Sequence, residues 1–90
     1  MAYKIENVAT ETWHRVMDDL AAAGFKETYR YGGFDAGIDY SRYELTSEAG
    51  GELVVFEWDN WTEGEISASQ SRLEALREKY QLGELVEVEE

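Results

Sequence analysis

The chain has 90 residues, enough for one folded domain and too few for a second independent core, so residues 1–90 are expected to form a single domain. It contains no cysteine, which excludes disulfides, thiol catalysis and cysteine-ligated zinc. Twenty acidic against eight basic residues give a net charge of −12, which disfavours direct binding to nucleic acid or to anionic membranes. No segment resembles a signal peptide or reaches the ~20 apolar residues of a membrane span, so we expect a cytoplasmic protein.

Residues 10–23 have the spacing of an amphipathic helix. The residues that share its apolar face are Trp13, Val16, Met17, Leu20 and Ala21. Thr10 is the expected N-cap, and Gly24 is the expected left-handed residue after the last turn. The preceding residues 3–8 are a candidate for a short strand.

After Gly24 the apolar period changes to two, which predicts a strand from residue 25 to residue 31 that breaks at Gly32-Gly33. A hairpin follows, with arms at residues 38–47 and 52–59 and a turn that contains Gly50-Gly51.

The register of this hairpin follows from parity. Tyr43 and Leu45 face the apolar side of the second arm only if paired residue numbers sum to an odd value, which requires a two- or four-residue turn. In both registers Arg42 lies opposite Glu57 or Asp59 and partly compensates its charge.

A second helix is predicted over residues 67–80, with Ser67 and Gln70 as a capping box and Gly83 as its end. Residues 84–88 can add an edge strand whose glutamates discourage unwanted pairing. The expected fold is α+β, with an antiparallel sheet of three to five strands, two helices on one face, and the order (β)-α-β-β-β-α-β.

No pattern predicts catalysis, a metal site or a cofactor. His14 has Asp18 one turn away, but no nucleophile accompanies the pair. A calcium loop beginning at Asp59 fails because Trp61 occupies its third position and Gln70 its twelfth. There is also no glycine-rich phosphate loop, so we expect neither an enzyme nor a cofactor-binding protein.

The negative charge is concentrated in residues 35–65, which carry nine acids and Arg42 as the only base. Aromatic residues lie among these acids, and buried aromatics dominate binding hot spots while charges steer the encounter. The residues predicted to bind a partner are Asp35, Asp39, Glu57, Asp59, Trp61, Glu63 and Glu65.

These residues predict a non-enzymatic protein that docks on a basic surface of a partner protein, such as the nucleic-acid cleft of a nuclease. In size and charge the chain is similar to inhibitors, immunity proteins and nucleic-acid mimics that occupy such clefts. The alternative is a structural or assembly domain that self-associates or joins a larger complex, with no inhibitory role.

Overall fold

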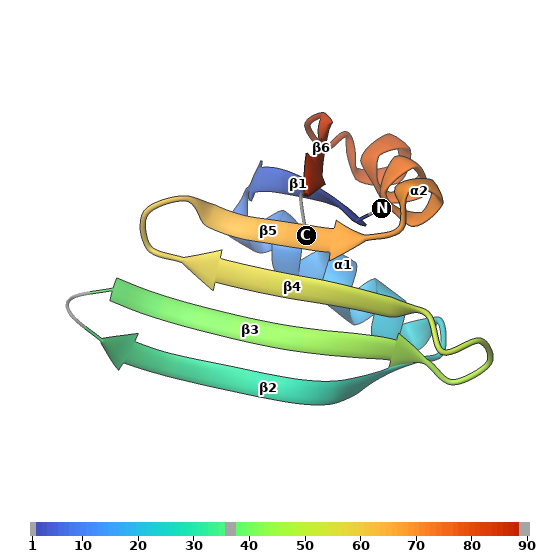
Figure 1. Ribbon diagram of the computed structural model, residues 1–90, viewed down its shortest axis with the longest axis horizontal. Helices are drawn as coiled ribbons and strands as arrows, with labels where there is room; N and C mark the ends of the chain where they lie inside the picture. The colour runs from blue at the N-terminus through green and yellow to red at the C-terminus, as the bar shows by residue number, and fades with distance from the viewer. Residues whose placement is uncertain (1, 36–37, 89–90) are drawn as a thin grey trace.

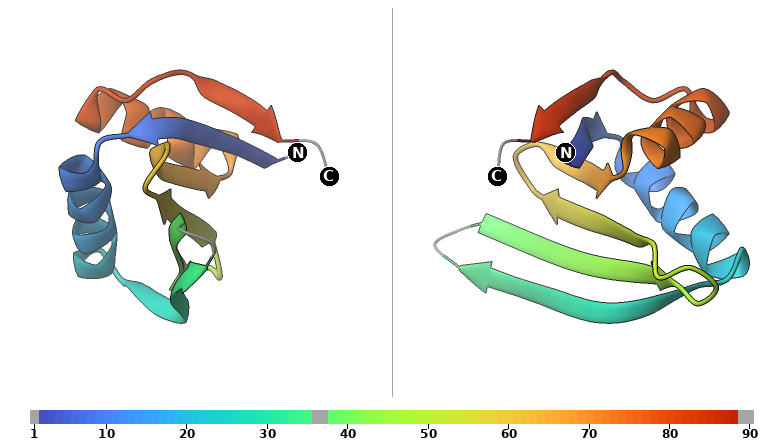
Figure 2. Two further views of the ribbon diagram at one scale, coloured as in Figure 1. Left: turned by 90° about the vertical axis from the view of Figure 1, so that its left-hand side faces the viewer. Right: turned by 45° about the vertical axis from the view of Figure 1, so that its right-hand side comes forward.

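The computed structural model describes residues 2–35 and 38–88, with only the backbone described at residues 2, 33–35 and 38–39. Its elements are β1 (Ala2–Val8), α1 (Thr10–Ala22), β2 (Phe25–Asp35), β3 (Ile38–Ser47), β4 (Leu53–Asp59), β5 (Glu63–Ala68), α2 (Gln70–Tyr80) and β6 (Leu85–Val88). The strands form one antiparallel sheet in the order β2-β3-β4-β5-β1-β6 (Figure 1). Both helices lie on the same side of this sheet (Figure 2).

The α+β class and the antiparallel sheet are confirmed, but the expected count of three to five strands is wrong because the sheet has six. The additional strand is β5, which lies between β4 and β1 near the middle of the sheet. Its inward positions begin with Gly64, which offers no apolar side chain to a sequence pattern. The Trp13 ring fills that space: a Cβ atom added to Gly64 would lie 2.4 Å from Trp13 Cδ1.

The expected strand break at Gly32-Gly33 is also wrong. β2 continues through both glycines, with Gly32 opposite Ser41 and Gly33 opposite Tyr40. Glycine lowers strand propensity, but a complete partner strand supplies the ladder that a local pattern does not show. A bulge interrupts the β2–β3 register only between Glu27 and Tyr29.

The predicted register of the β3–β4 hairpin is confirmed. Tyr43 pairs with Phe56 and Leu45 pairs with Val54, so the numbers sum to an odd value. The Ser47 amide donates to the Glu52 carbonyl at 2.8 Å, which leaves a four-residue turn at residues 48–51.

The capping residues of both helices differ from those expected, and α2 also begins later than expected. α1 starts at Thr10 itself, with Ala9 as its N-cap, and the Thr10 hydroxyl accepts a hydrogen bond from Trp58 Nε1 at 3.0 Å. α2 starts at Gln70, because Ser67 belongs to β5 and the cap is Ser69, whose hydroxyl accepts from the Arg72 amide at 3.3 Å.

The two helix ends differ in how well they follow the sequence. Gly24 has φ +104°, as expected for the residue that ends α1. α2 ends before Gly83, because Gln81 takes the left-handed conformation with φ 56° and its amide donates to the Arg77 carbonyl.

The core lies between the sheet and the helices. Its buried members are Ile5, Val8, Trp13, Val16, Leu20, Phe25, Leu45, Val54, Phe56, Ile66, Leu73 and Leu76. The Trp13 ring packs edge-on against Phe56 and Tyr43, at 6.0 Å and 5.8 Å between ring centroids. The opposite face of the sheet is uncovered by helices (Figure 2). Within the described residues, no helix combines the length and apolarity needed to cross a membrane.

Candidate functional site

The topology brings three separate segments to one end of the sheet, on the left in Figure 1. They are the β2–β3 hairpin end, the β4–β5 turn and the start of α1. Tyr40 of β3 pairs with Asp59 of β4, and Val8, just before α1, pairs with Gly64 of β5. We call this region the acidic end and define it by Glu11, Asp35, Asp39, Asp59, Trp61 and Glu63. Residues 9–13, 33–40 and 59–63 contain no lysine or arginine.

Asp59 fixes the turn between β4 and β5. Its Oδ1 accepts hydrogen bonds from the amides of Trp61, at 2.8 Å, and Thr62, at 2.7 Å, and both carboxylate oxygens accept from the Thr62 hydroxyl at 3.1 Å. The Thr62 amide, and then the Trp61 amide, lower the pKa of Asp59 because they stabilise the carboxylate. Asp59 therefore acts as the anchor of a rigid turn.

Trp61 lies at the tip of this turn with 77% of its surface exposed. The other two tryptophans are packed: Trp13 is 2% exposed, and Trp58 lies against the core. The other exposed large apolar side chains, such as Tyr31 at 48%, keep about half of their surface covered. Trp61 is thus an indole held out into solvent by a turn that is fixed from within.

Glu63 has a structural partner that the sequence did not reveal. Its Oε2 accepts a hydrogen bond at 3.2 Å from the amide of Thr10, the first residue of α1. A carboxylate at this position satisfies an unpaired helical amide and interacts favourably with the helix dipole. The contact spans 53 residues, so no local capping pattern could have indicated it.

Glu57 and Glu65 lie further from the turn along β4 and β5 than Asp59 and Glu63. They lie directly opposite each other on β4 and β5, on the sheet face that carries no helix. Arg42 Nη1 lies 3.5 Å from Glu57 Oε1, and the Tyr40 hydroxyl donates to Glu57 Oε2 at 2.5 Å. Lys4 Nζ lies 3.1 Å from Glu65 Oε1. Both carboxylates are therefore compensated by neighbours, which removes them from the acidic end.

The pKa values of Tyr40 and Lys4 are both raised beside these two carboxylates. Burial and then the hydrogen bond to Glu57 raise the pKa of Tyr40, so its hydroxyl stays protonated as a donor. The hydrogen bond to Glu65 raises the pKa of Lys4, which keeps its ammonium charged.

Of the seven residues predicted to bind a partner, the structure brings Asp59, Trp61 and Glu63 together on one turn. Asp35 and Asp39 have their backbone at the same end, next to the β2–β3 tip, and their side chains lie outside what the structure describes. Glu11, in the first turn of α1, was not among the predicted residues, because the β1–β5 pairing is what brings the start of α1 to the acidic end.

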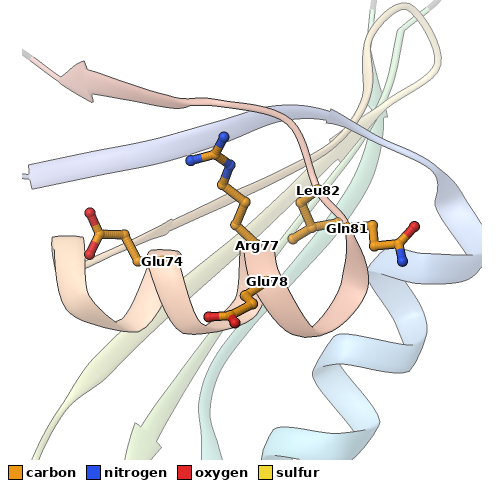
Figure 3. Close-up of a pocket in the computed structure, with 5 residues that line it drawn as sticks. All are labelled: Glu74, Arg77, Glu78, Gln81 and Leu82. Carbon is orange, nitrogen blue, oxygen red and sulfur yellow. The ribbon is translucent and has the colours of Figure 1, made fainter.

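A cavity of about 560 Å³ lies elsewhere, beside the C-terminal half of α2. It is lined by Glu74, Arg77, Glu78, Gln81 and Leu82. Its charged side chains point in different directions and do not converge on one position (Figure 3). This arrangement lacks the convergent polar groups that fix a small ligand.

The described residues also contain no group of three or more histidine, aspartate or glutamate side chains placed to hold a metal ion. His14 is exposed on α1, and its ring lies edge-on to Trp13 with 5.0 Å between centroids.

Comparison with protein-family models, curated proteins and solved structures gives no match to this chain.

Proposed function

We propose that this chain is a non-enzymatic binding protein that docks its acidic end on a basic surface of a partner protein. The observation that carries the proposal is Trp61, 77% exposed on a turn that Asp59 holds in place. A tryptophan in this position loses little conformational freedom on binding and offers a large apolar surface to a pocket. Tryptophan is also among the residues most enriched in binding hot spots.

The charge around Trp61 selects the kind of partner. Asp59 and Glu63 flank Trp61 on the turn itself, and the chain as a whole carries −12. This field attracts surfaces rich in lysine and arginine and accelerates association with them. The commonest such surfaces are nucleic-acid-binding clefts, so the chain would act as an inhibitor or immunity protein that competes with nucleic acid.

The test begins with affinity capture from the source cell, followed by kinetics with the captured protein. Trp61→Ala is expected to weaken its binding at least 30-fold, since the loss of a hot-spot residue exceeds about 2 kcal/mol. Val86→Ala, which shortens another exposed apolar side chain far from the acidic end, is the matched control and should bind normally. Unchanged affinity of the Trp61 variant would show that the site is wrongly assigned.

Charge and contact can be separated in the same assay. Asp59→Asn with Glu63→Gln removes two charges but retains an oxygen acceptor at each position. This double variant is expected to associate more slowly and to show a weaker salt dependence, with a smaller change in the dissociation rate. Inhibition is then tested directly, by asking whether the chain displaces nucleic acid from the captured protein.

A further inference from the structure

The two edges of the sheet are protected very unequally. β6 is a four-residue edge strand that contains Glu87 and is preceded by Glu84, and short strands and charges are common ways to discourage pairing. β2, the other edge, has eleven residues and spans about 35 Å. Its outer side faces no other element (Figure 1).

The protection that β2 has is confined to its first part. Lys26 and the bulge between Glu27 and Tyr29 both discourage pairing, but from Tyr29 to Asp35 the strand pairs with β3 without interruption. This second part has no proline and exposes Tyr29 by 45% and Tyr31 by 48%. A long, regular edge of this kind is a template for another strand.

We propose that β2 pairs with β2 of a second copy of this chain, antiparallel, to form a symmetric dimer with a continuous twelve-stranded sheet. The charge distribution favours a second copy. β2 carries Lys26, Glu27, Arg30 and Asp35, a net charge of 0 in a chain of −12. Two copies therefore meet with the least electrostatic repulsion along this edge.

A register centred on Tyr31 suits the residues that would pair. It places Tyr31 opposite Tyr31 of the second copy, and Tyr29 opposite Gly33, so no like charges face each other between residues 29 and 33; Glu27 and Asp35 fall opposite each other only at the two ends of the pairing. Cross-strand aromatic pairs stabilise sheets, and a tyrosine can cover the surface that a glycine leaves bare. Arg30 falls opposite Gly32, which leaves its ion pair with Glu27 at 3.0 Å undisturbed.

The antiparallel direction follows from the acidic ends. β2 runs toward the acidic end, so a parallel dimer would bring two such ends side by side. Antiparallel pairing points them in opposite directions and leaves both copies of Trp61 free. The dimer and the proposed partner binding are therefore compatible, and each can fail without the other.

Sedimentation velocity of the full chain tests this proposal. The expected result is a reversible species of about 20.6 kDa, twice the chain mass of 10.3 kDa, that becomes more populated at 1 M than at 0.05 M NaCl. Binding to a basic partner should show the opposite salt dependence. A sedimenting mass that stays monomeric up to millimolar concentration in high salt would overturn the dimer.

Two lysine substitutions locate the interface. Tyr31→Lys places two ammonium groups opposite each other at the dimer axis and should weaken association at least tenfold. Val86→Lys changes a comparably exposed side chain on the other edge strand and should leave association intact. Circular dichroism checks that both variants fold. Equal effects of the two substitutions would place the contact away from β2.

Discussion

Gly64 and Trp13 show how one residue position depends on a side chain from another layer. Gly64 has no side chain, and the space beside it is occupied by the ring of Trp13, which is 2% exposed. A methyl group at position 64 would lie 2.4 Å from Cδ1 and 2.7 Å from Cγ of that ring. Both distances are well below van der Waals contact, and the surrounding core leaves the ring little room to shift.

Gly64→Ala is therefore expected to lower the free energy of unfolding by about 1–3 kcal/mol, the usual range for overpacking a filled core. Urea denaturation followed by tryptophan fluorescence measures this loss. Gly50→Ala is the control, because a Cβ there meets nothing within 4 Å, and its effect should stay within about 0.5 kcal/mol. A stable Gly64 variant would show that the Trp13 ring does not occupy this space.

Glu52 provides a residue-scale test of pH dependence. Its carboxylate accepts from Arg72 Nε at 2.7 Å and from Nη2 at 2.9 Å, a bidentate pair that joins the residue just before β4 to α2. The Arg72 guanidinium lowers the pKa of Glu52 from its ordinary value of 4.5. A lowered folded-state pKa gives stability that is present above the ordinary value and is lost as the pH falls through the folded value.

Glu52→Gln should thus destabilise the protein by about 0.5–1 kcal/mol at pH 7, because both side chains remain about one-third exposed. The difference between wild type and variant should shrink as the pH approaches 3, as measured by urea denaturation at each pH. Glu48→Gln is the comparison: Glu48 is exposed in the adjoining turn and forms no ion pair with the described residues. A wild-type advantage that persists unchanged at pH 3 would assign the effect to side-chain packing instead.

At the scale of elements, the start of α2 shows a capping pattern in the sequence that the structure does not follow. Ser67 and Gln70 match a capping box, yet Ser67 lies in β5 and Ser69 caps the helix. Ser69→Ala is expected to destabilise the fold by about 0.5–2 kcal/mol because the Arg72 amide loses its acceptor. Thermal denaturation of Ser69→Ala and Ser67→Ala compares the two directly, and a larger loss from Ser67→Ala would contradict this helix boundary.

Elements with their own apolar period were predictable from the sequence. The faces of α1 and β4 are visible as spacing, and the β3–β4 register follows from parity alone. β5 was hidden because its inward face is supplied in part by Trp13, which is distant in sequence. The continuation of β2 through Gly32-Gly33 was hidden for a related reason, since the pairing with β3 compensates for low local propensity.

Some features of the candidate site were likewise predictable from the sequence, and others required the three-dimensional fold. Trp61 and its neighbouring acids could be selected from composition, because an aromatic residue among carboxylates is a local feature. The compensation of Glu65 by Lys4 could not, because it depends on the pairing of β1 with β5. The role of Glu63 at the start of α1 likewise requires the three-dimensional fold.

At the scale of the whole molecule, excess negative charge competes with specific ion pairs. The ion pairs between described residues involve Lys4, Arg30, Arg42, Arg72 and Arg77. Their atoms are within 3.5 Å, so salt screens them little, and exposed pairs contribute only ~0–1 kcal/mol each. The remaining carboxylates repel one another across a molecule of 38 × 28 × 26 Å. The Debye length falls from about 30 Å at 0.01 M salt to about 8 Å at 0.15 M, which removes most of this repulsion.

Sodium chloride should therefore stabilise the monomer, with Tm rising by roughly 4–8 °C if the gain is on the order of 1 kcal/mol. Thermal scans at low micromolar concentration, from 0.01 to 0.3 M salt, measure the effect without a contribution from association. The triple variant Glu48→Gln, Glu78→Gln, Glu87→Gln lowers the net charge to −9 at exposed positions that form no ion pair with the described residues. It should be more stable than wild type at 0.01 M and show a shallower rise, because less repulsion remains to be screened. A fall in the Tm of wild type with salt would mean that the ion pairs outweigh the repulsion. The excess negative charge would then not destabilise the folded chain.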